Sequence, residues 1–369
     1  MSREEVFFLA LTLIKGLGNS YRNKLISYFS SYEKIFDASI KELKKSGLRE
    51  ELCKEVTLKK TIKEAENLIS FHEKKNVKII TQVSKIYPTR LLHIHNAPGV
   101  LFYKGNLNLN QKKIISIVGT RKVTAVGKNF IEKFISDLEN SEILIVSGLA
   151  YGVDIEAHKC SLNKNLKTLA IYGGGIDMVY PSDHKKYADE IESSGGLITE
   201  YPLGTKVEAY QFVERNRIIA GVSDATIVVE APNKSGALLT AEYANQCNRE
   251  VFAVPGSVFE KNYEGAHKLI KLNLARLITS AEDLLNEMNW IETSKAPQQK
   301  KISLDDLNLS DDEKKIVALI KNSKNKKIHI DDLHASENFN SSSLASLLLQ
   351  LEISEIISSL PGRFFSLKE

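Results

Sequence analysis

Small residues and cationic side chains follow an apolar run in the middle of the chain, in a pattern that predicts phosphate binding. Gly119, Thr120, Arg121 and Lys122 come directly after that run, and Thr124 then caps a predicted helix. Small residues let backbone N–H groups and the positive end of a helix approach an anion, and a guanidinium such as that of Arg121 can hold two phosphate oxygens. The segment therefore predicts a phosphate site.

Further loops of the same kind follow later apolar runs. They are Ser147-Gly148, Gly173-Gly174-Gly175 and Lys234-Ser235-Gly236. Lys234 stands just before a predicted helix, where it adds a second point charge for phosphate. A triple glycine alone is typical of a tight turn. Together with Gly119 and Gly148, it predicts that these loops form one electropositive cleft at a single edge of a sheet.

Another cluster combines an aromatic ring with cationic and amide side chains. Phe212 is followed by Arg215, Asn216 and Arg217. A single-strand binder needs an aromatic face to stack a base, guanidinium groups for phosphates and an amide for base edges. We expect Arg215 and Arg217 to contribute to binding, whereas Phe212 can face either the ligand or the core.

Other chemistries find less support. Asp154 and His158 are four residues apart on a predicted helix, which we interpret as a surface pair. Cys53, Cys160 and Cys247 are too widely spaced for a zinc ribbon or a redox pair. The chain has no P-loop, and three consecutive glycines are not the spaced dinucleotide fingerprint. We expect no metal and no cofactor.

Length and charge restrict the classes that remain. The 369 residues exceed what one hydrophobic core usually organises, so two or three domains are expected. Fifty Lys and Arg against 46 Asp and Glu give a net charge of +4, a mild excess that permits a nucleic-acid partner without requiring one. The odd number of cysteines and the lack of an apolar run of about 20 residues favour a cytoplasmic protein without membrane contact.

The middle of the chain alternates short β-branched runs with amphipathic stretches, which is typical of a parallel sheet covered on both faces. The predicted strands are 113–118, 143–147, 168–172, 196–199, 226–230 and 251–254. With a helix over 126–138 between the first two, they predict a doubly wound, mostly parallel α/β domain over residues 76–291. Its ligands should bind outside the carboxyl ends of the strands.

Residues 1–75 carry helical periodicity and predict an all-helical domain. Gly16-Leu17-Gly18 between two apolar stretches is typical of a helix-hairpin-helix, which presents backbone N–H groups to DNA phosphates, but also of an ordinary helix stop. Few cations stand nearby, so DNA contact here is a secondary hypothesis.

Residues 292–309 read as a polar linker, and residues 310–369 predict three helices and a hairpin, the layout of a winged helix. Residues 302–369 hold eight basic and eleven acidic residues, a net charge of −3, which leaves +7 for residues 1–301. The presumed recognition helix has no Arg or Lys, the residues on which major-groove readers depend. We expect a protein contact or a spacer here rather than DNA reading.

Five ordered motifs together resemble the DNA-processing protein A family, also called DprA or Smf. They are 117–121, 146–150 with Gly152, Asp154, Ala157 and His158, 173–177 with Tyr180-Pro181, 215–221, and 254–256. The resemblance covers about residues 77–285. It implies an extended Rossmann-like core between a helical (SAM-like or helix-hairpin-helix) N-terminal domain and a C-terminal winged helix.

The resemblance also implies a function. The family is expected to comprise non-catalytic single-stranded DNA-binding proteins that protect incoming strands during natural transformation and load the RecA recombinase, as homodimers and in contact with single-strand-binding protein. The DNA-binding residues expected here are Gly119, Thr120, Arg121, Lys122, Ser147, Gly148, Gly174, Phe212, Arg215, Asn216, Arg217, Lys234, Ser235 and Gly236. The expected dimer interface comprises His267, Leu269, Ile270 and Leu272, although a helix packed on its own sheet fits this partly apolar stripe equally well.

Two departures from the family pattern remove positive charge near the predicted cleft: Tyr151 stands where Arg is usual, and Val213-Glu214 replaces Pro-Arg. A competing hypothesis is a nucleotide-binding or nucleotide-hydrolysing enzyme in which Asp177, Glu200 or Glu230 acts as general acid or base. A third is a transcription regulator that uses the winged helix, which the acidic balance there disfavours.

Overall fold

The computed structural model describes residues 1–291, 309–323, 327–337, 340–354, 356–360 and 363–367. They form two units, residues 1–290 and 291–369. The predicted linker at 292–309 lies almost entirely outside the described residues. The predicted boundary at residue 75 stays a prediction, because the N-terminal helices and the sheet belong to the same unit.

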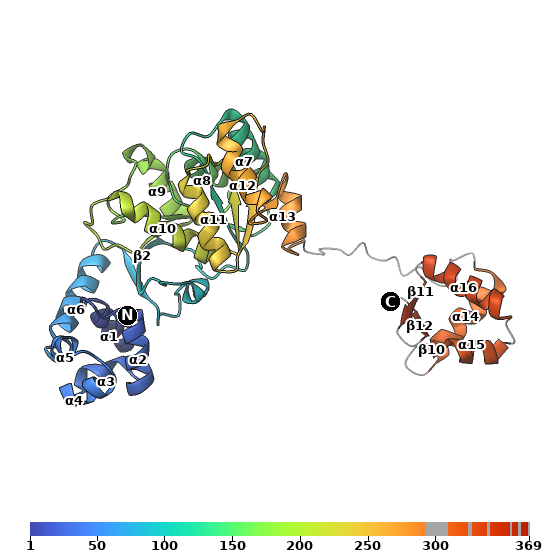
Figure 1. Ribbon diagram of the computed structural model, residues 1–369, viewed down its shortest axis with the longest axis horizontal. Helices are drawn as coiled ribbons and strands as arrows, with labels where there is room; N and C mark the ends of the chain where they lie inside the picture. Colours follow the sequence, from blue (N-terminus) through green and yellow to red (C-terminus); the bar gives the residue numbers. More distant parts are fainter. Residues whose placement is uncertain (292–308, 324–326, 338–339, 355, 361–362, 368–369) are drawn as a thin grey trace. The chain divides into compact units, whose positions relative to one another are not determined.

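A nine-stranded sheet organises the first unit (Figure 1). Its strands, in spatial order, are β1 (Lys78–Thr81), β2 (Val100–Gly105), β6 (Gly196–Thr199), β5 (Thr168–Ile171), β4 (Leu144–Ser147), β3 (Ile114–Val118), β7 (Ala225–Val228), β8 (Glu250–Ala253) and β9 (Arg276–Leu277). β1 and β2 pair antiparallel, and every pair from β6 to β9 is parallel. The six predicted strands are confirmed. The sequence analysis missed β1 and β2, which lack the strand–helix alternation, and β9, which has two residues.

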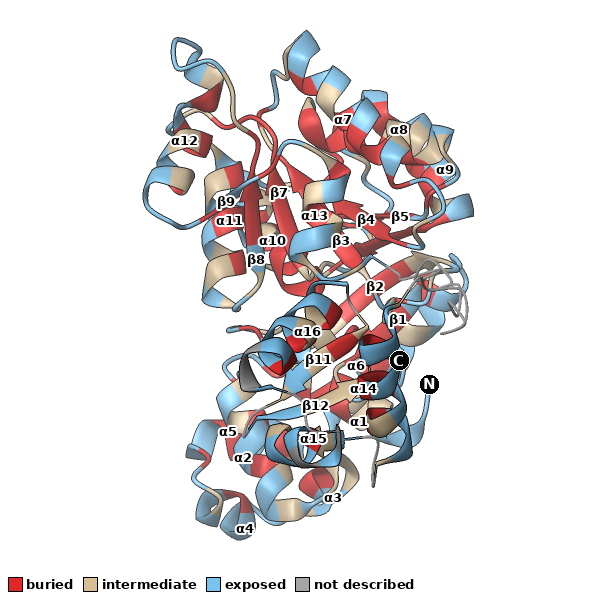
Figure 2. Ribbon diagram, turned by 90° about the vertical axis from the view of Figure 1, so that its right-hand side faces the viewer, coloured by how far each residue is buried: buried red, intermediate tan, exposed pale blue. Residues whose placement is uncertain are grey.

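Helices cover both faces of the parallel strands, as the pattern predicted. They are α7 (Ala125–Asp137), α8 (Val153–Asn163), α9 (Lys185–Ser194), α10 (Ala209–Val222), α11 (Gly236–Gln246), α12 (Glu264–Lys271) and α13 (Ala281–Glu287), with short 3₁₀ turns at Thr89–His93, Ser182–His184 and Lys261–Tyr263. Ile115 and Ile117 of β3 pack with α7, α8 and α13, and the alternate residues Ile114 and Val118 pack with α10 and α11. The strands are therefore buried on both faces (Figure 2).

The order of the strands fixes where a ligand can bind. From β3 the chain builds β4, β5 and β6 on one side, and then crosses to β7, β8 and β9 on the other side. The loops that leave β3 and β7 therefore run to opposite sides and open a crevice at the carboxyl ends of these neighbouring strands, the usual ligand position in a doubly wound sheet.

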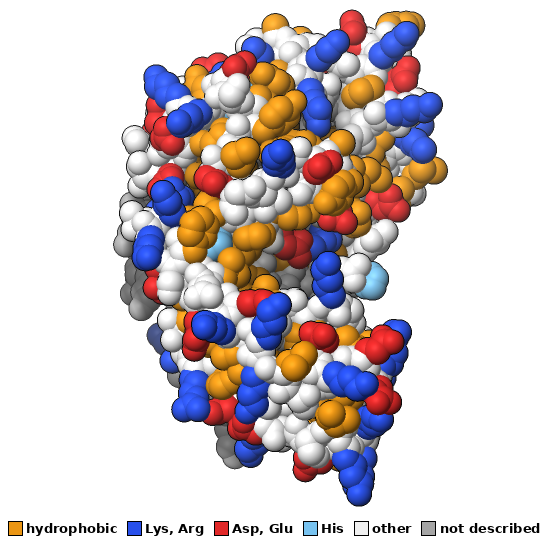
Figure 3. Space-filling view, turned by 90° about the vertical axis from the view of Figure 1, so that its left-hand side faces the viewer, with side chains coloured by type: hydrophobic (Ala, Val, Ile, Leu, Met, Phe, Trp, Pro, Cys, Tyr) orange, Lys and Arg blue, Asp and Glu red, His pale blue; other side chains and the backbone are white. Residues whose placement is uncertain are grey.

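Six helices precede the sheet: α1 (Arg3–Thr12), α2 (Asn19–Phe29), α3 (Tyr32–Asp37), α4 (Ile40–Lys45), α5 (Glu50–Thr57) and α6 (Lys60–Glu73). His72 of α6 joins them to the core, since its ring stacks on Phe102 and its Nε2 accepts the Leu203 N–H at 3.0 Å. Arg22 is buried and donates to the Leu17 carbonyl oxygen at 2.7 Å, so it is not open to DNA. In Figure 3 the surface of this helical part carries interspersed cations and anions.

The second unit comprises α14 (Asp311–Asn322), β10 (Lys327–His329), α15 (Ile330–Glu337), α16 (Ser341–Ile353), β11 (Ile357–Leu360) and β12 (Phe364–Leu367). Its three strands form an antiparallel sheet in the order β10-β12-β11, consistent with the predicted winged helix. α16 exposes Leu349 and Ile353 and carries neither Arg nor Lys. In the part of the chain that the structure describes, no helix is both long and apolar enough to cross a membrane.

Candidate nucleic-acid interface

A cavity of about 330 Å³ opens at the crevice between β3 and β7. Its walls come from the loops after these two strands and from α8, α10 and α11. Nine of the predicted DNA-binding residues line it, namely Gly119, Thr120, Arg121, Phe212, Arg215, Asn216, Lys234, Ser235 and Gly236. The structure thus brings together, at one site, residues that lie more than 100 positions apart in the sequence.

The N-terminus of α11 forms one wall of the cavity. Ser235 caps the helix by accepting the Ala237 N–H at 3.3 Å, and Asn216 Nδ2 on α10 donates to the Gly236 carbonyl oxygen at 3.3 Å. Gly236 and Lys234 are both exposed. The wall therefore offers a helix N-terminus and an exposed ammonium to an anion.

Arg121 and Phe212 also line the cavity and lie against each other. The Arg121 guanidinium carbon lies 5.8 Å from the centre of the Phe212 ring, which is the geometry of a cation–π contact. Arg121 is exposed and Phe212 is half-buried. The sequence left the side of Phe212 open, and the structure turns its ring toward the cavity rather than into the core.

The sequence suggested that the Arg215 guanidinium binds a DNA phosphate, but the structure buries this side chain. The side chain lies at the bottom of the cavity, only 4% exposed, and Nη1 donates to the Ile171 carbonyl oxygen at 2.6 Å. Burial lowers the pKa of its guanidinium, and the nearby Asp154 carboxylate opposes that shift. Arg215 therefore acts on the cavity chiefly as a fixed, partly neutralised charge below its floor.

The interpretation of Asp154 and His158 as a surface pair is wrong, because α8 turns both side chains inward. Burial raises the pKa of Asp154, and the Arg215 cation opposes the shift. Burial, assisted by that cation, lowers the pKa of His158 to about 3, and its Nδ1 lies 2.7 Å from Thr168 Oγ1. The spacing of four residues says only that two side chains share a helix face, and cannot tell which face it is.

Arg217 is not in the cavity. It forms an ion pair with Glu200 and is 16% exposed, so its charge is already compensated. Lys122 is exposed but does not line the cavity, and Ser147, Gly148 and Gly174 serve packing. The Ser147 hydroxyl donates to the Ile117 carbonyl oxygen at 2.6 Å, Gly148 leaves space for the Arg215 guanidinium, and Gly174 lies against Val207.

Glu230 positions the first glycine loop, a role that the sequence analysis missed. Its buried carboxylate accepts the Thr124 N–H at 3.1 Å, the Thr124 hydroxyl at 2.5 Å and the Tyr263 hydroxyl at 3.1 Å. Its backbone oxygen accepts the Thr120 N–H at 2.7 Å. A buried acidic residue at the end of an apolar strand was the available signal, because such a carboxylate must find donors.

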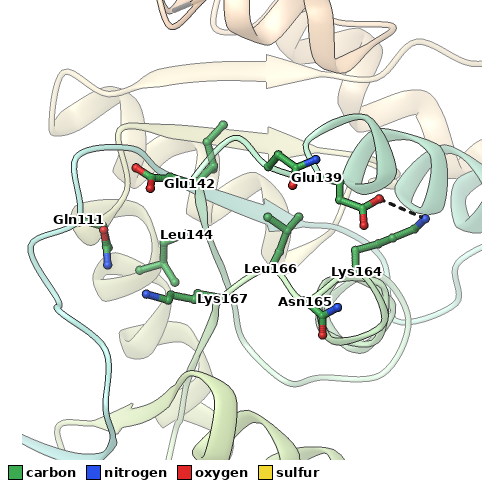
Figure 4. Close-up of a pocket in the computed structure, with 10 residues that line it drawn as sticks. Gln111, Glu139, Glu142, Leu144, Lys164, Asn165, Leu166 and Lys167 are labelled. Carbon is green, nitrogen blue, oxygen red and sulfur yellow. Dashed lines mark ion pairs between the residues drawn. The ribbon is translucent and has the colours of Figure 1, made fainter.

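A second cavity, of about 370 Å³, lies at the opposite, amino-terminal edge of the strands. Lys164 and Glu139 form an ion pair at its rim with 3.6 Å between Nζ and Oε2, and Glu142 and Lys167 add one charge of each sign (Figure 4). This balanced lining does not favour phosphate. Across all the described ranges, this cavity included, no group of three or more His, Cys, Asp or Glu side chains could hold a metal ion.

The predicted dimer stripe is only partly open to a partner. Leu269 is 7% exposed and packs on the core, Ile270 is half-buried against it, and His267 Nε2 lies 3.1 Å from the Gly256 carbonyl oxygen. Leu272 is the exposed member, at 55%. The packing of a helix on its own sheet, the alternative considered for this stripe, thus accounts for Leu269 and Ile270.

Comparison with known proteins matches this architecture to one family. The family model for the DNA recombination-mediator protein A matches residues 78–289. Protein Smf of Synechocystis is 36% identical over 311 residues, which cover 81% of this chain and 76% of that protein. The DNA processing protein DprA of Streptococcus pneumoniae is 42% identical over 204 residues, which cover 55% of this chain and 72% of that protein.

Solved structures agree with the sequence comparisons. The X-ray structure of DNA processing protein A from Streptococcus pneumoniae superposes with a TM-score of 0.64 at 33% identity, and covers 78% of this chain and 98% of that one. A structure of DNA processing protein A from Helicobacter pylori, described for its mode of single-stranded DNA binding, gives a TM-score of 0.53 at 26% identity and covers 58% and 95%. With its doubly wound core and the glycine loops around one cavity, the chain belongs to the DNA-processing protein A (DprA/Smf) family of recombination mediators.

Proposed function

We propose that this protein binds single-stranded DNA in the cavity between β3 and β7. The observation that carries the proposal is that two unlike groups of residues line one cavity. Arg121 and Phe212 lie in contact, and the capped N-terminus of α11 and Lys234 line the same cavity. A phosphate fits against the cations and the helix end, and a base fits against the ring.

The arrangement favours a single strand over a duplex. An aromatic face can stack only on a base that is not already stacked between neighbours, and every base offers a π-face. Binding should therefore be tolerant of sequence and weaken with salt as counterions are released from the phosphates.

We propose binding rather than catalysis, because the carboxylates considered for acid–base chemistry are engaged in the structure. Glu200 pairs with Arg217, Asp177 accepts the Gly204 N–H at 3.0 Å, and Glu230 holds Thr124 and Tyr263. A nucleotide-hydrolysis assay with the purified protein should give no activity. Turnover that Glu200→Gln abolishes would favour the enzyme hypothesis instead.

The cavity can be tested by titrating labelled dT oligonucleotides and matched duplex DNA into the full chain, with fluorescence anisotropy as the readout. Phe212→Ala should weaken dT binding by about 5-fold or more, since one base–aromatic stack is worth about 1–3 kcal/mol. Arg121→Ala should also weaken it, because it removes an exposed cation that lines the cavity. Lys122→Ala is the matched control, because it removes an adjacent exposed charge that does not line the cavity. Unchanged affinity in both cavity variants would place the DNA elsewhere.

Within this function we propose that the bound strand is protected and passed to the RecA recombinase in the cytoplasm, with single-strand-binding protein as a neighbour on the same DNA. We also propose a homodimer through the surface at the C-terminal end of α12, supported by the 55% exposure of Leu272, which follows the helix. Light scattering should give a dimer mass that Leu272→Arg reduces to the monomer. RecA filament assembly on DNA coated with single-strand-binding protein should accelerate in the presence of the wild-type chain but not of Phe212→Ala.

A further inference from the structure

Two exposed tyrosine rings stand in loops beyond the cavity, and one of them contacts Phe212. The ring centres of Phe212 and Tyr180 are 5.7 Å apart, with 48° between the ring planes. Tyr180 stands in the loop between β5 and α9 and is 53% exposed. Tyr151, in the loop after β4, is 44% exposed. Two neighbouring loops at the carboxyl edge of the sheet thus each present one open tyrosine ring.

The protein holds Tyr151 in place without covering it. Its ring makes a T-shaped contact with the buried His184 ring, with centres 4.8 Å apart and planes at 71°. His184 is itself fixed, because its Nδ1 lies 2.8 Å from the Leu149 carbonyl oxygen. The Tyr151 hydroxyl donates to Asp183 at 3.0 Å. The Asp183 hydrogen bond raises the pKa of the Tyr151 hydroxyl.

Charge divides this surface into an inner part for phosphates and an outer part for bases. The exposed cations Arg121 and Lys234 stand at the cavity. Beside Tyr151 stands the exposed carboxylate of Asp183, which repels phosphate but not a base stacked on a ring. The outer part therefore suits an uncharged aromatic ligand group.

Single exposed apolar side chains are common on protein surfaces and mean little by themselves. These rings differ because Tyr180 contacts Phe212, which lines the cavity, and because His184 and Asp183 hold Tyr151 in the neighbouring loop. In Figure 3, hydrophobic side chains on the upper part of the face stand among Lys, Arg, Asp and Glu side chains.

We propose that Tyr180 and Tyr151 form an outer stacking shelf that holds bases of the same DNA strand whose neighbouring nucleotides occupy the cavity. The proposal rests on the proposed function, since the strand must first bind at Phe212. It extends the site from the cavity along the carboxyl ends of β5 and β4. A strand long enough to reach the shelf then gains stacking contacts, at about 1–3 kcal/mol per base in comparable sites, or about 5- to 150-fold in affinity.

The test is a length series, dT4 to dT16, titrated into the full-length wild type and into Tyr180→Ala, Tyr151→Ala and the double variant. The double variant should bind dT16 at least about 5-fold more weakly than wild type and bind dT4 equally well. Equal dT4 affinity also reports that the cavity is folded. Tyr180→Phe and Tyr151→Phe keep the rings and should retain dT16 affinity. Tyr28→Ala removes a ring of similar exposure on α2 and should change nothing.

Two results would overturn the shelf, and they are distinguishable from failure of the cavity itself. If the double variant binds every length as the wild type does, while Phe212→Ala loses binding, the strand leaves the cavity by another route. If the double variant loses dT4 and dT16 equally, the tyrosines act by supporting the cavity. A wild-type chain that binds no dT oligonucleotide contradicts the proposed function as well.

Discussion

The guanidinium of Arg215 occupies the space that a Cβ atom on Gly148 would need. The side chain reaches past the end of β4, donates to the Ile171 carbonyl oxygen and ends near the buried carboxylate of Asp154. Gly148 and Arg215 therefore depend on each other. The glycine after β4, which the sequence suggested as a backbone approach to phosphate, instead admits a cation beneath the cavity.

Gly148→Ala should destabilise the protein strongly. The added methyl group must displace a buried guanidinium from its partners, and breaking a buried charged contact costs about 3–5 kcal/mol. Urea unfolding followed by circular dichroism measures the loss. Gly236→Ala is the control, since only Asn216 Nδ2, at 3.9 Å, stands near a Cβ there, and it should unfold within about 1 kcal/mol of wild type. A Gly148→Ala protein as stable as the control would contradict the packing described.

Glu230→Ala should loosen the loop that carries Arg121. The change leaves the Thr124 hydroxyl and the Tyr263 hydroxyl without their acceptor, and each unsatisfied buried group costs about 1–3 kcal/mol. We expect a lower unfolding midpoint together with faster amide exchange over residues 119–124. Glu230→Gln keeps one acceptor oxygen, so its unfolding midpoint and its loop exchange rate should lie between those of the wild type and Glu230→Ala. If exchange of the loop is unchanged in Glu230→Ala, the carboxylate is not what positions it.

Lys234 and Lys122 should differ in their effect on salt dependence, although both are exposed cations. Each phosphate contact on a single strand contributes about 0.7 to the slope of log K against log salt. Lys234→Gln should reduce the magnitude of the slope by about that amount, because Lys234 lines the cavity. Lys122→Gln should leave the slope near that of wild type. Titrations of dT16 between about 50 and 300 mM NaCl, over which the Debye length falls from above about 10 Å to below about 8 Å, measure both slopes. Equal slopes for the two variants would indicate a diffuse electrostatic field rather than a defined phosphate contact.

His158 should make the protein sensitive to acid. Its pKa is about 3 in the fold, against an ordinary value of 6.5, so below about pH 6.5 the unfolded chain binds a proton that the native state refuses. Stability should fall by up to about 1.4 kcal/mol per pH unit as the pH drops from 6.5 toward 3, on account of this residue alone. The difference between the urea unfolding midpoints at pH 7.5 and pH 5.0 should be smaller for His158→Gln than for the wild type. His95 is exposed, so the control His95→Gln should show the same difference as the wild type.

Much of the architecture was predictable because it depends on local pattern. Buried β-branched runs separated by amphipathic stretches specify β3 to β8, and the helical periodicity of the first 75 residues specifies α1 to α6. Glycine loops after the strands also indicated which edge of the sheet carries the site. The sequence analysis missed the antiparallel pair β1 and β2 because no helix separates them in the strand–helix pattern, and it missed β9 because two residues are too few to show a pattern.

The sequence by itself determined the fold class, the family and the loops that surround the cavity, because each of these follows from the order and type of residues along the chain. Only the tertiary structure decided what each cation does. Arg215 and Arg217 have the same side chain and stand two positions apart on α10, about 200° around the helix. One therefore enters the floor of the cavity and the other meets Glu200, since the direction of a side chain depends on which face of the helix the sheet covers.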